Sequence, residues 1–181
     1  MDALTALQTR TAAPRLVEPA PSQAELEQVL KAGLRAPDHG LLRPWRFLVA
    51  SGEGRQRLGR LLADTLQPAT PEEQTKLQNA PLRAPVVIVA VAAITEHPKV
   101  PAVEQIASTA AAVQNMSVAL HALGYASIWR TGPAAHDARI APALGMQPQD
   151  QVVGYLYVGT ATFSERPVPE HALSDFVEYW A

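Results

Sequence analysis

The sequence predicts a mixed α/β or α+β domain in which helices pack on a central sheet. Segments with helical periodicity alternate along the chain with short apolar runs that are typical of strands. Val86 to Val91 is a valine-rich run without a polar residue, as expected for a strand buried on both faces. With 181 residues, the chain fits one domain over 1–181, or one subunit of a compact oligomer.

Helices and strands alternate through the first half of the chain. A short helix is predicted over Asp2 to Gln8, and Pro14 prevents its continuation. The capping-box pattern of Ser22 to Glu25 begins a second helix, which ends before Pro37. The other predicted elements here are a strand over Trp45 to Ala50, a helix over Ser51 to Leu66, a helix starting at Thr70-Pro71, and the strand Val86 to Val91.

The segment from Gln105 to Trp129 contains no Asp, Glu, Lys or Arg. Its first part has helical spacing, and a helix without a charged face is buried all round. A chain of this length hardly covers such a helix alone, so we expect part of it to pack against a second subunit. The helical spacing places five residues on one face: Ile106, Ala110, Val113, Ser117 and Leu120.

The second half continues the alternation and ends in an aromatic tail. Gly124 ends the uncharged helix, and Ala126 to Trp129 is predicted as a strand. A short helix is expected around Asp137 to Leu144, with Gly145 as its C-cap, before a strand over Val152 to Thr160. The tail should run extended and needs a surface for its apolar side chains, Phe176, Tyr179 and Trp180.

Composition excludes several classes of function. The chain has no cysteine, which excludes disulfides, thiol nucleophiles and Cys-ligated metal. A net charge of −2 and few aromatic residues argue against nucleic-acid binding. Neither a signal peptide nor a transmembrane run is evident, so we expect a cytoplasmic protein without membrane contact. The five histidines show no metal-ligand spacing, so we expect no metal site.

Motif searches point away from chemistry carried by protein side chains. Gly52-Glu53-Gly54 suggests a dinucleotide-binding turn, but Arg57 stands where the third glycine belongs, and a solvated turn is the better interpretation. No phosphate-loop, serine-nucleophile or zinc-protease motif occurs. If the protein is an enzyme, a bound cofactor should therefore carry the reaction. Trp45 and Trp129 are candidate walls of a flat ligand slot, with core packing as the alternative.

Several segments together resemble the flavin-dependent nitroreductase family, and within it the short, YdjA-like NAD(P)H nitroreductases. The resemblance covers roughly residues 1 to 160, and the order and spacing of the segments make it specific. The matching segments are Asp2 to Thr11, Arg35 to His39, Arg43 to Phe47, Val113 to Asn115, Gly124 to Gly132 and Val153 to Gly159.

The resemblance implies an α+β, nitroreductase-like three-layer sandwich with a mainly antiparallel sheet, assembled as a domain-swapped homodimer with FMN at the interface. No side chain is then expected to be catalytic, because flavin N5 carries the chemistry. The residues implied for FMN are Arg10, Thr11, Ala12, Arg35, His39, Arg130, Thr131 and Gly132, with Arg35 and His39 coming from the partner. The residues implied for NAD(P) are His121, Ala122, Leu123, Gly124, Tyr125 and Ala126.

By the same resemblance, NADH or NADPH would reduce the flavin, which would then reduce a nitroaromatic or quinone-like small aromatic acceptor in a ping-pong cycle. Two alternatives stay open. One is a flavoenzyme of the same fold with another task, such as dehalogenation, enone reduction or ring oxidation. The other is a non-catalytic flavin-binding dimer. The sequence departs from the family pattern at Ala12, where serine is usual, and at Arg43, where glutamine is common.

Overall fold

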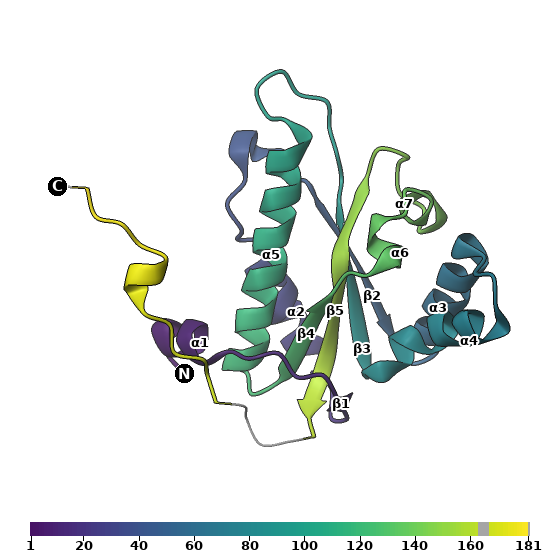
Figure 1. The fold of residues 1–181 in the computed structure, drawn as a ribbon, viewed down its shortest axis with the longest axis horizontal. Helices are drawn as coiled ribbons and strands as arrows, with labels where there is room; N and C mark the ends of the chain where they lie inside the picture. The colour runs from purple at the N-terminus through teal and green to yellow at the C-terminus, as the bar shows by residue number, and fades with distance from the viewer. Residues whose placement is uncertain (163–166, 181) are drawn as a thin grey trace.

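The computed structural model describes residues 1–162 and 167–180 and has a five-stranded sheet at its centre (Figure 1). The strand order is β1-β5-β3-β2, and β4 pairs with β5 beside β1. All of these strand pairs are antiparallel, which confirms the predicted α+β class. The strands are β1 (Leu16–Val17), β2 (Trp45–Ser51), β3 (Val86–Ala92), β4 (Ala126–Arg130) and β5 (Gln151–Ala161).

One face of the sheet is covered by α5 (Ala102–Ala122), with α2 (Gln23–Gly33) packed beside it (Figure 1). Alternate residues of β3 enter this layer, because successive side chains of a strand point to opposite faces. The two helices approach closely: a Cβ added at Gly33 would lie 2.8 Å from Cγ of Met116. The β3 residues of this layer are Val86, Ile88 and Ala90.

The opposite face carries α3 (Glu53–Leu66) together with the single turns α6 (Pro133–His136) and α7 (Ile140–Ala143). The remaining β3 valines, Val87, Val89 and Val91, belong to this second core. Helix α4 (Pro71–Asn79) packs on α3, and short 3-10 turns η1 (His39–Leu41) and η2 (Ala80–Arg83) precede β2 and β3. Layers on both faces give the three-layer arrangement that the resemblance implied.

Most predicted elements are confirmed, and two differ. Helix α1 (Ala3–Thr9), the capping box of α2 and the buried strand β3 are present. The two-residue strand β1 was not predicted. The short helix expected around Asp137 to Leu144 is present as the shorter α7, whereas α6 before it was not predicted. Between them the backbone of Asp137 is extended, and its carboxylate accepts from the N–H of Arg139 at 2.9 Å. This turn separates α6 from α7.

Helix α5 is not buried all round in the single chain, and its buried stripe includes only Val113, Ser117 and Leu120 of the five residues that the spacing placed on one face. Ile106 and Ala110 are only half-buried, whereas the buried stripe contains polar side chains. Gln105 accepts from the N–H of Thr95 at 2.9 Å and donates to backbone carbonyls, so its burial is compensated by hydrogen bonds. The buried stripe is Gln105, Ser108, Thr109, Ala112, Val113, Met116, Ser117 and Leu120.

Two surfaces remain uncovered in the single chain: an uncharged face of α5 and the aromatic C-terminal tail. The outward face of α5 exposes Val103, Ala107 and Gln114, and Val103 is 67% exposed. The C-terminal tail, which includes η3 (Leu173–Asp175), extends away from the sheet and its helices (Figure 1). Its aromatic side chains Phe176, Tyr179 and Trp180 are 73%, 84% and 91% exposed, respectively. In the described part of the chain, none of the helices combines the length and apolar character that crossing a membrane requires.

Candidate functional site

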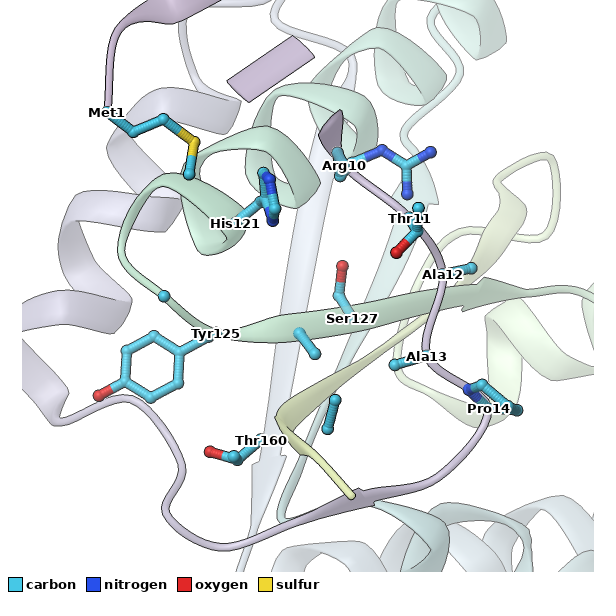
Figure 2. A pocket seen from close by; sticks show the side chains of 13 residues that line it. Met1, Arg10, Thr11, Ala12, Ala13, Pro14, His121, Tyr125, Ser127 and Thr160 are labelled. Carbon is cyan, nitrogen blue, oxygen red and sulfur yellow. The ribbon is translucent and has the colours of Figure 1, made fainter. Parts of the chain in front are cut away.

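A pocket of about 300 Å³ lies beside β4, where the chain leaving α1 passes the strand (Figure 2). One wall is formed by residues 10–14, and the other by residues 124–127 at the start of β4. The lining is completed by Met1, His121, Thr160 and Ala161. Two segments that are far apart in the sequence therefore form one pocket.

The first wall is placed by a capped helix and a backbone bridge. The carboxylate of Asp2 accepts from the N–H groups of Leu4 and Thr5, which begins α1. The helix ends at Arg10, whose backbone is extended. Three residues later, the N–H of Ala13 donates to the carbonyl of Ser127 at 3.1 Å. These two anchors carry the predicted flavin-binding residues Arg10, Thr11 and Ala12 into the pocket lining.

The second wall is the turn that joins α5 to β4. Gly124 has a φ of +87°, a left-handed conformation that favours glycine and lets the chain reverse here. The hydroxyl of Tyr125 donates to Oε2 of Glu25 at 3.0 Å, and this hydrogen bond raises the pKa of Tyr125. Of the segment predicted for NAD(P), His121, Gly124, Tyr125 and Ala126 line the pocket, whereas Ala122 and Leu123 do not.

A buried pair of serines lies beneath this wall. Ser127 is 3% exposed, and its Oγ lies 3.0 Å from Oγ of Ser117 on α5. This hydrogen bond joins β4 to α5 under the pocket. Ser127 lies in the matching segment Gly124 to Gly132, but the sequence analysis did not single it out as a lining residue. Its burial depends on the pairing of β4 with β5, which a single sequence does not reveal.

The charge of the lining favours an anion. Arg10 and His121 are its two basic side chains, and the lining includes neither Asp nor Glu. Figure 2 shows the Arg10 side chain close to the Thr11 hydroxyl at one end of the pocket. A guanidinium and a hydroxyl side by side are donors suited to phosphate oxygens.

Arg130 lies just behind the first wall. Its Nη2 donates to the carbonyl of Pro14 at 3.5 Å, and its guanidinium carbon lies 5.8 Å from the centre of the Tyr157 ring. Its Nε is buried and has no hydrogen-bond partner within the residues that the structure describes. Thr131 and Gly132 follow on the surface, and Gly132, with a φ of +71°, begins α6. None of these three residues lines the pocket itself.

Arg35 and His39 lie elsewhere in the chain. Ala36 packs with Trp45 of β2 and Ala112, and β2 is separated from β4 by two strands, about 14 Å across the sheet. Nδ1 of His39 lies 2.5 Å from Oε2 of Glu104, near the first turn of α5. His121 is near the last turn, about 26 Å along the helix. The structure therefore does not bring Arg35 or His39 to the pocket of the same chain.

The two tryptophans have different environments. Trp45 is 7% exposed in a small core cluster, which favours the core-packing alternative. Trp129 is 39% exposed, and its indole Nε1 donates to the carbonyl of Val153 at 3.3 Å. A Cβ added at Gly154 would lie 2.1 Å from this nitrogen, so glycine leaves the space that the indole occupies.

Comparisons with known proteins agree with this architecture. The family model described as "Nitroreductase family" matches residues 16–160. The Escherichia coli strain K12 protein named "Putative NAD(P)H nitroreductase YdjA" is 43% identical over 162 residues, which is 88% of each chain.

Two solved structures have the same fold at low sequence identity. A nitroreductase-like family protein from Bacillus cereus has a TM-score of 0.85 at 21% identity, over 99% of this chain and 96% of that one. The FMN and NADPH-dependent nitroreductase NfnB from Sphigopyxis sp. strain HMH has a TM-score of 0.76 at 19% identity, over 100% of both chains. The architecture and the match over most of the sequence confirm the resemblance: the chain belongs to the nitroreductase family.

Proposed function

We propose that this protein is an FMN-dependent NAD(P)H oxidoreductase that acts as a homodimer and reduces nitroaromatic or quinone-like acceptors. The observation that carries the proposal is the pocket beside β4, where Arg10 and Thr11 provide donors and no lining residue is acidic. Membership of the nitroreductase family gives this anion-favouring pocket its interpretation. The names of YdjA and NfnB support the same chemistry.

The described residues fit a flavin mononucleotide. Arg10 and Thr11 offer a guanidinium and a hydroxyl to the phosphate and the ribityl chain. Arg130 adds a buried Nε–H, next to the same wall, that none of the described residues accepts from. An unpaired buried donor is costly unless a ligand or water accepts from it. Ala12 lacks the hydroxyl usual in the family, so the contact at this position is limited to its backbone.

A second copy of the chain would complete the site. Arg35 and His39 lie away from the pocket of their own chain, so they reach a flavin only across an interface. The uncharged outward face of α5 and the exposed aromatic tail give such an interface apolar area. A tail that leaves its own body in this way favours the domain-swapped arrangement that the resemblance implies.

In the proposed reaction, bound FMN supplies the reversible hydride acceptor. The residues of the chain bind and orient it rather than react. Arg10 and Thr11 hold the phosphate end, and Arg130 with neighbouring backbone amides favours negative charge on the ring system. No side chain has to serve as nucleophile, which agrees with the absence of such a motif from the sequence. NADH or NADPH and then the acceptor would use the same open slot in turn.

The absorbance spectrum of the purified protein tests the proposal. We expect a yellow preparation, or stoichiometric uptake of added FMN, followed by bleaching under anaerobic NADH or NADPH. Sedimentation should show a dimer. Reoxidation by a nitroaromatic or a quinone supports the proposed acceptor class, whereas reoxidation only by an enone or a halogenated aromatic supports the alternative flavoenzyme. Flavin that binds but is not reduced supports the non-catalytic dimer, and a protein that takes up no FMN refutes the proposal.

A further inference from the structure

The helix that precedes Arg10 is weakly held on the body of the protein. Helix α1 has seven residues, and Ala6 is its one buried side chain. Its two leucines, Leu4 and Leu7, are 67% and 54% exposed. So little buried apolar area contributes little to holding the helix in one position. A polar contact therefore matters more here than it would on a well-buried helix.

That contact joins the last residue of α1 to the last turn of α5. Oγ1 of Thr9 lies 2.8 Å from Nε2 of His121, and both residues are partly buried. Thr9 is adjacent to Arg10, whose own N–H makes only a long 3.3 Å bond to Ala6. The next backbone hydrogen bond along the segment runs from the N–H of Ala13 to the carbonyl of Ser127. The segment that contains Arg10 is thus held at one end by the Thr9–His121 contact and at the other by the hydrogen bond from Ala13 to Ser127.

The direction of the Thr9–His121 hydrogen bond follows from proton counting. The Thr9 hydroxyl has one proton, which it donates to the carbonyl of Thr5 at 2.6 Å. Its oxygen must then accept from the imidazole, so Nε2 of His121 carries a hydrogen. Both the neutral Nε2–H tautomer and the imidazolium satisfy this requirement. The contact therefore persists whichever charge the ring has.

We propose that His121 is a positioning residue that fixes the Arg10 segment for phosphate, acting through Thr9 rather than by touching the flavin. The inference rests on the proposed function, since Arg10 is there the phosphate ligand. Its consequence is selective: loss of the contact weakens binding of a flavin that has a phosphate more than binding of a flavin that has only the ribityl chain. A purely structural role for His121 would weaken both equally.

Matched variants of Thr9 and His121 test this selectivity. Thr9→Val removes the hydroxyl with little change of shape, whereas Thr9→Ser keeps it. His121→Ala removes the donor, whereas His121→Gln keeps an N–H near the same place. Each protein is titrated with FMN and with riboflavin, which lacks the phosphate. We expect Thr9→Val and His121→Ala to weaken FMN binding about three- to tenfold. Riboflavin binding should weaken less than FMN binding. Thr9→Ser should behave as wild type, and His121→Gln should retain more FMN affinity than His121→Ala.

Unchanged FMN affinity in Thr9→Val, or equal losses for both flavins, overturns the inference. Thr9 is partly exposed, so this variant tests the idea even if His121→Ala fails to fold. Hydrogen exchange over residues 1–14 gives a readout without flavin: it should be faster in Thr9→Val than in Thr9→Ser, and equal rates overturn the inference. A wild-type protein that takes up no flavin refutes the proposed function instead, and the exchange comparison still decides whether this contact holds the segment.

Discussion

Two arginines at opposite edges of the sheet allow a direct test of whether the site forms between subunits. Arg10 lines the pocket beside β4, whereas Arg35 follows α2 on the β2 side. We expect Arg10→Ala and Arg35→Ala each to lower FMN affinity. Loss of one charge-assisted hydrogen bond costs about 1.5–3 kcal/mol, which corresponds to about ten- to hundredfold in affinity.

Mixing the two variants predicts a specific recovery. In a heterodimer of one Arg10→Ala and one Arg35→Ala subunit, one site lacks both arginines and the other site has both. Random exchange gives about half heterodimers, so about one quarter of all sites regain wild-type affinity. Purification of the heterodimer through two different affinity tags raises this fraction to one half.

Fluorescence quenching of FMN measures the recovery. The titration is done at a subunit concentration between the wild-type and variant dissociation constants, so that only restored sites fill. Each variant alone should show a single weak phase, and the heterodimer a tight phase of half the total amplitude. A heterodimer without the tight phase would contradict the shared site, because both arginines would then serve one chain or neither would bind flavin.

Three further changes probe the fold and the interface. Gly154→Ala places a Cβ in the space of an indole and should lower stability by about 2 kcal/mol, measured by urea unfolding with tryptophan fluorescence; wild-type stability would contradict the predicted clash. Ala107→Glu puts a charge on the uncharged outward face of α5 and should raise the dimer dissociation constant, measured by sedimentation, at least about tenfold. Gln56→Glu at an exposed position of α3 should leave it unchanged, and equal dissociation constants for the two variants would argue against this interface. Arg139 hydrogen-bonds Asp137 and lowers the pKa of its carboxyl to about 2, so the contribution of the pair to stability is present above about pH 4 and is lost as the pH falls toward 2. Arg139→Gln should return the pKa of Asp137, measured by NMR, toward 3.8, and an unchanged pKa would exclude Arg139 as the cause.

Local signals in the sequence were sufficient for much of the fold. The capping box of α2 is complete, because Ser22 and Glu25 each satisfy the other's backbone. The strand from Val86 was predicted as central, and its residues pack into both cores. Such features depend on neighbours in the chain, so residue type and spacing are enough to identify them.

The sequence did not predict which polar residues are buried, because their hydrogen-bond partners lie in distant segments. The inward face of α5 contains Gln105 and Thr109, which are buried only because loop carbonyls accept their hydrogen bonds. Ser117 was assigned to one face with Val113 and Leu120, and the sequence did not reveal that it bonds Ser127 across the fold. For this reason, Ser117→Glu would disrupt the protomer itself and does not test the dimer interface. The exposed Ala107 is the better position for that purpose.

Part of the candidate site was predicted from the sequence. Arg10, Thr11 and Ala12, which the resemblance to the nitroreductase family implied for the site, line the pocket. That His121 shares the pocket with them was not predicted, because the contact between Thr9 and the end of α5 joins distant segments. Whether these residues bind FMN or NAD(P) stays a prediction for the titrations described above.

A site completed by a second subunit links flavin binding to assembly. If Arg35 and His39 of the partner contact the flavin, a lone chain binds FMN more weakly than a dimer, because it provides only Arg10, Thr11 and Arg130. Thermodynamic linkage then requires FMN to tighten the dimer by the corresponding factor. Sedimentation at several concentrations should therefore give a lower dimer dissociation constant with saturating FMN than without it. Each dimer has two flavin sites, so Arg35→Ala should shrink the ratio of the two dimer dissociation constants by the square of the factor that it removes from FMN affinity per site. A dimer indifferent to FMN would mean that each chain holds a complete site.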